Sequence, residues 1–146
     1  MAVPTGSGTE TLHSHWFYDV DGAQTLIFGA QHHIYTVTNI IVCCTALNSS
    51  TDYAYINFKG HDSHSGTSGS VSCLLRVNIP VGETFAWNER FSFYGYEPQN
   101  ANALSVTQQI AIAAQAGSVA QELRFDCSDP GDSFHIMVSY IDQDWS

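Results

Sequence analysis

The chain has 146 residues, the size of a single domain, and a formal net charge of −10. Four Lys and Arg residues stand against fourteen Asp and Glu residues, so the electrostatic field of the protein repels phosphate backbones and anionic lipids. The composition therefore argues against nucleic acids and membranes as partners. Charged residues make up 12% of the chain, about half the usual ~25%, so neutral polar side chains or other copies of the protein must cover much of the surface.

The first ten residues differ in composition from the rest. They combine Pro4, Gly6 and Gly8 with small polar side chains, which bury too little area to become ordered by themselves. They contain no basic n-region and no apolar h-region, and no later apolar run approaches the ~20 residues that span a bilayer. We therefore expect a flexible arm over residues 1–10, a single domain over residues 11–146, and neither an export signal nor a membrane anchor.

Strand patterns fill the first half of the domain. Short β-branched or aromatic runs, over residues 11–18, 23–28, 34–47 and 53–59, are separated by turn residues. The longest run contains neither Gly nor Pro, and we expect it to form a hairpin with the run that follows it. On the first strand, the alternation places His13, His15 and Phe17 on one face and Leu12, Ser14 and Trp16 on the other.

Residues 74–87, LLRVNIPVGETFAW, contain an apolar run, a turn and a second apolar run. Pro80 and Gly82 supply the turn chemistry between the two runs. This segment predicts the central hairpin of an all-β domain. The predicted core contains Leu75, Val77, Ile79 and Phe85 from this segment, together with Ile40, Val42 and Ile136.

One short helix is predicted in the second half. Ser105 followed by Gln108 has the spacing of a capping box, and Gly117 stands where a C′ residue belongs, so residues 106–116 read as a helix. The alternative is a β-arm, because several apolar residues of this segment also fit a period of two.

The other segments of the second half read as strands and turns. Residues 60–70 are polar and predict an exposed loop between two paired strands, residues 90–96 predict a strand, and residues 119–127 and 133–141 predict two more around the turn at 128–132. Many short strands with turns between them are typical of an antiparallel β-sandwich, and we expect a jelly-roll-like arrangement.

The four cysteines lack the spacing of a metal or redox motif. Adjacent residues of a strand point to opposite faces, so a bridge between Cys43 and Cys44 would be strained. We expect four reduced thiols, with a bridge between Cys73 and Cys127 as the alternative.

Five segments in chain order carry a family resemblance: TVTNIIVCCTAL, YAYINF, LLRVNIPVGETFAW, RFSFYGY and MVSYID. Together they resemble the small β-sandwich structural proteins of tailed bacteriophages, above all the head decoration, or cement, proteins and the related head-fibre and tail accessory modules. The resemblance covers residues 25–96 and 133–141. Residues 97–118 depart from the usual compact pattern, and the histidine-rich segments have no counterpart in the family.

The resemblance implies a non-enzymatic virion protein without a cofactor. Such a protein is made in the host cytoplasm, lies on the capsid surface and stabilises the phage head through contacts with the major capsid protein. The resemblance also implies a homotrimer, and the scarcity of charge independently favours self-association. The alternative within the same family is a tail or head-fibre module that binds a host glycan.

Aromatic residues exceed what one core face needs, and exposed aromatic side chains are typical of protein contacts. The predicted capsid or subunit contacts are Val3 and Pro4 in the arm, and Trp16, Tyr53, Tyr55, Tyr94, Tyr96 and Trp145 in the domain. No motif in the sequence resembles a nucleophile elbow, so no catalytic residue is assigned.

A second alternative is a cupin-like metal-binding protein. His13 and His15, followed by Asp19, resemble half of the cupin metal motif, and a third ligand would come from His61, His64 or His135. The glycine spacing of cupins is absent, so His13 and His15 are weak metal candidates and we expect no bound metal. The late acidic residues lack EF-hand spacing and are expected to be solvated; they are Asp126, Asp129, Asp132, Asp142 and Asp144.

Overall fold

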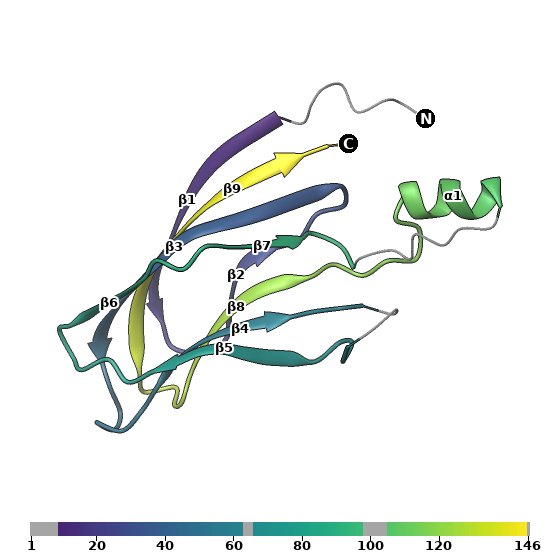
Figure 1. Cartoon of the computed structure of the whole chain (residues 1–146). Coiled ribbons are helices and arrows are strands. Elements are labelled where there is room, and N and C mark those ends of the chain that lie inside the picture. The colour runs from purple at the N-terminus through teal and green to yellow at the C-terminus, as the bar shows by residue number, and fades with distance from the viewer. Residues whose placement is uncertain (1–8, 63–65, 98–104, 146) are drawn as a thin grey trace.

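The computed structural model describes residues 9–62, 66–97 and 105–145, which fold into two antiparallel sheets packed face to face (Figure 1). The predicted all-β sandwich with one short helix is confirmed. The strands are β1 (Thr9–Val20), β2 (Gln24–Phe28), β3 (His33–Ala46), β4 (Ala54–Lys59), β5 (Val71–Val77), β6 (Thr84–Trp87), β7 (Phe91–Tyr94), β8 (Glu122–Cys127) and β9 (Ser133–Asp144), and the helix is α1 (Val106–Ala113).

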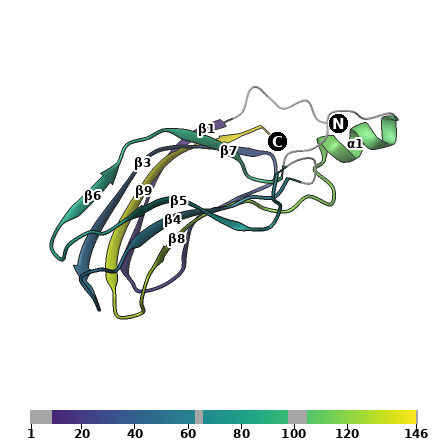
Figure 2. The ribbon, with the colours of Figure 1, turned by 60° about the horizontal axis from the view of Figure 1, so that its bottom comes forward.

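The order of the strands is that of a jelly roll. The five-stranded sheet has the order β1-β9-β3-β6, with β7 also paired to β3, and the four-stranded sheet has the order β2-β8-β4-β5. Most connections cross from one sheet to the other, and β4 and β5 form a hairpin within the four-stranded sheet. The first strand therefore pairs with the last, and the two sheets close around a single core (Figure 2).

The predicted central hairpin over residues 74–87 is wrong. β5 lies at the edge of the four-stranded sheet, whereas β6 pairs with β3 in the five-stranded sheet, so the turn at Pro80 and Gly82 carries the chain between sheets. The predicted pairing of residues 34–47 with 53–59 is wrong for the same reason, because β3 and β4 lie in different sheets. The predicted pairing across the loop at 60–70 is confirmed by the β4–β5 ladder.

The core lies between the sheets, where alternate residues of β3, β8 and β9 interdigitate. Four predicted core residues are buried: Ile40, Val42, Ile79 and Ile136. The other three, Leu75, Val77 and Phe85, are half-buried and pack against the core from β5 and β6. Their partial exposure follows from their position on strands at the margin of the sandwich.

All four cysteines are free thiols. Cys73 of β5 is exposed, and its cross-strand neighbour is Asn57 of β4. Cys127 ends β8 opposite Ala54, at the other end of β4. The alternative bridge between these two cysteines is therefore not formed.

Two glycines bring three loops into backbone contact. A Cβ atom added to Gly29 would lie 1.9 Å from the carbonyl oxygen of Gly95, and one added to Gly95 would lie 2.1 Å from that of Ala30. The amide of Gly29 donates to Gln121 O, and the amide of Gln121 donates to Gly95 O, both at 2.8 Å. This contact holds together two points of the chain: the one where it leaves the sandwich toward α1 and the one where it returns to β8.

The helix prediction is confirmed, and the alternative β-arm is not formed. Ser105 Oγ accepts a hydrogen bond from the amide of Gln108, and Gln108 Oε1 accepts one from the amide of Ser105, which together form the capping box. Gly117 has φ 77°, the left-handed conformation expected after a helix end. α1 ends at Ala113, before the predicted limit of residue 116.

Candidate functional site

The outer face of the five-stranded sheet begins with apolar side chains on β1. The predicted alternation holds, because His13, His15 and Phe17 are half-buried whereas Leu12, Trp16 and Tyr18 point outward. Trp16 is 61% exposed and Tyr18 is 68% exposed, which is unusual for aromatic side chains in a regular strand. β1 therefore presents two aromatic rings and a leucine to its surroundings.

This apolar surface continues across the sheet. The strand register sets Trp16 opposite Met137 of β9, Met137 opposite Ile41 of β3, and Ile41 opposite Ala86 of β6. Residues directly opposite each other on neighbouring strands lie on the same face of a sheet, so these four side chains form a row across it. We call this row, together with Leu12 and Tyr18, the outer apolar face.

The four-stranded sheet has a different exterior. Three of the four Lys and Arg residues of the chain, Lys59, Arg76 and Arg124, lie on its strands, and Arg90 lies in the connection between β6 and β7. Glu122 and Asp126 alternate with Arg124 along β8, opposite in phase to the buried Leu123 and Phe125. The outer surface of the four-stranded sheet is thus charged and hydrated. The outer apolar face is the surface whose chemistry suits a protein contact.

The other predicted contact residues are spread over the molecule. Tyr53 and Tyr55 are half-buried beside each other near β5, and the guanidinium of Arg76 lies 4.5 Å from the Tyr53 ring. Tyr94 is 48% exposed on β7, at the opposite margin of the five-stranded sheet from β1. Tyr96 forms an isolated bridge with Ala120, and the half-buried Trp145 packs its ring against His32. Val3 and Pro4 lie outside the described residues.

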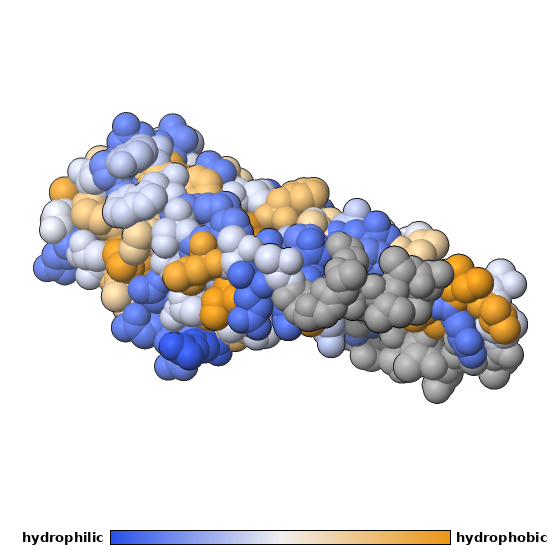
Figure 3. Space-filling view, turned by 90° about the horizontal axis from the view of Figure 1, so that it is seen from above, coloured by the Kyte–Doolittle hydropathy of each residue, from blue (hydrophilic) through white to orange (hydrophobic). Residues whose placement is uncertain are grey.

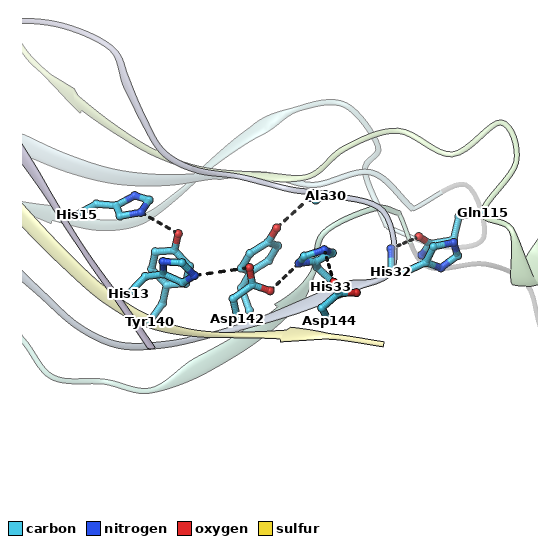
Figure 4. Close-up of polar contacts among 10 residues, drawn as sticks. His13, His15, Ala30, His32, His33, Gln115, Tyr140, Asp142 and Asp144 are labelled. Carbon is cyan, nitrogen blue, oxygen red and sulfur yellow. Dashed lines mark hydrogen bonds and ion pairs between the residues drawn. The ribbon is translucent and has the colours of Figure 1, made fainter. Parts of the chain in front are cut away.

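A row of polar side chains lines the inner face of the five-stranded sheet at the end where β1 begins and β9 ends (Figure 4). Tyr140 Oη and His15 Nε2 form a hydrogen bond of 3.2 Å, and the Tyr140 ring stacks on His13. Asp142 lies between two histidines, with Oδ1 2.6 Å from His33 Nδ1 and Oδ2 3.9 Å from His13 Nε2. We call these five residues the polar row; it joins β1, β9 and β3 through side chains.

Burial and negative charge raise the pKa of the phenols in this region. Burial raises the pKa of Tyr35 to about 12, and the negative charge of Asp142 adds to that effect. Burial also raises the pKa of Tyr140, with a further contribution from Asp142. A phenol is protonated at neutral pH even at its ordinary pKa of about 10, so the Tyr140 hydroxyl can donate to His15.

The structure separates the residues of the cupin-like hypothesis. His13 and His15 point inward from β1, whereas Asp19 contacts His135 Nε2 at 3.1 Å on exposed side chains of β1 and β9. His61 lies near the four-stranded sheet, where its amide donates to Gln121 Oε1, and His64 lies outside the described residues. No group of three or more His, Cys, Asp and Glu side chains is arranged to hold a metal ion within residues 9–62, 66–97 and 105–145.

The late acidic residues do not form one cluster. Asp129 and Asp132 lie in the turn between β8 and β9, whereas Asp142 and Asp144 contact His33 at the other end of β9. Asp132, expected to be solvated, is instead 1% exposed and accepts hydrogen bonds from the amides of Asn48 and Asp129. Burial, together with the neighbouring carboxylate of Asp52, raises the pKa of Asp132. The sequence holds no signal for this burial beyond the turn itself.

The polar row and the outer apolar face share β1 but differ in what they can do. The polar row links β1 and β9 to β3 through side chains, whereas the outer apolar face leaves two aromatic rings exposed. Among the described helices, none is long and apolar enough to cross a membrane.

In the comparison with known proteins, no protein-family model matches the chain, and no curated protein matches its sequence.

Proposed function

We propose that this chain is a non-enzymatic structural protein of a bacteriophage particle that binds the capsid and stabilises it. In this proposal the partner is the major capsid protein, the location is the capsid surface, and the protein acts as a homo-oligomer, with three copies as the resemblance implies. The contact surface is the outer apolar face.

The outer apolar face carries the proposal because it has the chemistry of a protein contact. Trp and Tyr dominate the binding energy of protein interfaces, and Trp16 and Tyr18 are both largely exposed. The strands that form this face contain no Lys or Arg, so a partner can cover it without burying an unpaired cation. Thr9 and Glu10, the last two residues of the predicted arm, are the first residues of β1, the strand that carries Trp16 and Tyr18.

A capsid-binding assay with Trp16→Ser tests the proposal. Truncating a central aromatic residue typically costs 2 kcal/mol or more, so we expect the affinity for empty capsids to fall by roughly 30-fold or more. Phe28→Ser is the matched control, because it removes an exposed aromatic ring from β2, a strand of the other sheet. We expect the control to bind capsids as the unchanged protein does.

Two results would contradict the proposal. One is the absence of stoichiometric binding to capsids by the unchanged protein. The other is binding to host polysaccharide that depends on Trp16 while capsid stability is unaffected, which would favour the alternative of a glycan-binding tail or head-fibre module. A loss of capsid binding in Phe28→Ser equal to that in Trp16→Ser would contradict the assignment of the contact to the outer apolar face.

A further inference from the structure

α1 stands apart from both sheets, and no residue of it is buried (Figures 1 and 2). It has eight residues, whereas isolated helices shorter than about 12–15 residues are marginal in water. The capping box contributes about 1 kcal/mol to such a helix, which does not replace the tertiary packing that usually stabilises one. The helix therefore lacks, within the described part of a single copy, the apolar surface that it would pack against.

Two hydrogen bonds attach the C-terminal end of α1 to the sandwich. The buried side chain of Gln115 accepts a hydrogen bond of 2.7 Å from the amide of His32, and Gln31 Nε2 donates to the carbonyl oxygen of Ala114. Both bonds reach the connection between β2 and β3, which the contact of Gly29 with Gly95 holds in place. The direction of the helix is thus set at its C-terminal end, while its exposed residues 106–110 project from the molecule.

The projecting turns carry an apolar stripe. Val106 is 70% exposed and Ile110 is 64% exposed, and their spacing of four residues places them one above the other on the helix. Ala113 extends the same face by one turn. Apolar atoms gather accordingly at the end of the molecule formed by α1 (Figure 3).

Charge indicates what covers this stripe. Residues 98–121 contain no Asp, Glu, Lys, Arg or His, although the chain as a whole carries a net charge of −10. Two copies of so acidic a protein repel each other over most of their surfaces, and that repulsion is smallest where both surfaces are uncharged. A positively charged partner would gain nothing from an uncharged helix, whereas a second copy of this chain gains an apolar contact at the place of least repulsion.

We infer that α1 is the surface through which copies of this chain associate, helix against helix, with Val106 and Ile110 at the contact. Helices related by a closed rotation bury identical stripes against each other and leave none exposed. An eight-residue helix is about 12 Å long, so the contact is far smaller than the ~800 Å² per partner of a standard interface. Association of the free protein is therefore weak and reversible. The inference specifies the self-association within the proposed function and does not depend on binding to a capsid.

Sedimentation velocity over a range of protein concentrations tests the inference. The unchanged chain should sediment at 16.0 kDa when dilute and at a multiple of that mass when concentrated. Salt should not dissociate it, because no charges lie at the contact. The variant carrying both Val106→Gln and Ile110→Gln should stay at the mass of one copy at every concentration. Gln has a higher helix propensity than Val or Ile, so these substitutions remove the apolar stripe without weakening the helix.

Thr107→Gln is the matched control, since it introduces the same side chain on the same helix beside the stripe. It should associate as the unchanged chain does, and circular dichroism should show the same fold for all three proteins. The inference is overturned if the unchanged chain remains a single copy at millimolar concentration, or if the double variant associates as strongly as the control. Capsid binding is measured separately: a chain that associates through α1 but binds no capsid would refute the proposed function and leave this inference standing.

Discussion

The two ends of the inner face of the five-stranded sheet are built from different chemistry. At the end that faces the turn between β8 and β9, Phe134, Val42 and Cys44 are completely or almost completely buried, and the ring of Phe134 packs against that of Phe125 from the opposite sheet. At the other end, the polar row takes their place. The apolar end is stabilised by burial and dispersion, whereas the other end combines the polar row with the buried rings of Tyr35, Tyr140 and Phe93. At the polar end, side-chain contacts thus add to apolar packing and link β1 to β9 and β3.

The largest effect is expected from Phe134→Ala at the apolar end. Removing a fully buried aromatic ring leaves a cavity, and such changes cost about 3–5 kcal/mol of the free energy of unfolding. Urea denaturation measures the loss. Phe28→Ala is the control, because its exposed ring on β2 should contribute less than about 0.5 kcal/mol. Equal losses in the two variants would show that the apolar end does not dominate stability.

Asp142→Asn probes the polar end. Asp142 and His33 are both mostly shielded from water, and loss of a charge-assisted hydrogen bond between them should cost about 1–2 kcal/mol. Asp144→Asn should cost well under 1 kcal/mol, because its carboxylate is more exposed and lies 3.6 Å from His33 Nε2. Hydrogen exchange should show faster opening of β1 and the end of β9 in Asp142→Asn only. Unchanged exchange in β1 would mean that the polar row does not hold this strand.

Asp52→Asn tests the response of the apolar end to pH. A carboxyl group whose pKa is higher in the folded protein contributes stability that is fully present below its unfolded pKa and is lost as the pH rises through the folded value. Removing the Asp52 charge lowers the folded pKa of Asp132 toward its ordinary value, so the variant should lose less stability between pH 4 and pH 7.5. The measurement is the urea midpoint of both proteins across that range. Parallel profiles would contradict the role given to Asp52.

The smallest expected effect concerns the reactivity of the cysteines. Their thiols can be labelled selectively without changing the fold. Burial raises the pKa of Cys127 to about 11, so only about 0.03% of it is thiolate at pH 7.5, and burial also raises the pKa of Cys44. Cys73 is exposed on β5 and should react first with iodoacetamide. Peptide mapping after a short pulse identifies the labelled residue. Labelling of Cys127 as fast as Cys73 would show that the apolar end opens readily.

Local patterns in the sequence predicted the elements well and their partners poorly. Alternation identifies a strand such as β5 or β6 from its own residues, but it does not reveal whether the partner is the next strand in the chain or one in the other sheet. The two hairpin predictions, at residues 74–87 and between β3 and β4, were wrong because turns that cross between sheets contain the same residue types as turns within one sheet. The helix was predictable because its capping box is local.

The candidate site was predictable only in part. The outward position of Trp16 follows from the alternation of β1, whereas its neighbours Met137 and Ile41 come from distant strands and depend on the register. The contact of His33 with Asp142 joins residues 109 positions apart, and neither residue has a local signal for the other. Non-local pairing is thus the information that the sequence patterns lacked.

The pairing of β1 with β9 has a consequence for how the protein is made. At a synthesis rate of about 5–20 residues per second, roughly 6–25 s pass between the completion of β1 and that of β9. During translation β1 emerges with Leu12, Trp16 and Tyr18 exposed and with the strand that pairs with it not yet made. β3 also pairs with β9, so the five-stranded sheet cannot close until β9 has left the ribosome. The apolar side chains of β1 therefore stay without their pairing strand until β9 has been made, whatever the final stability of the protein.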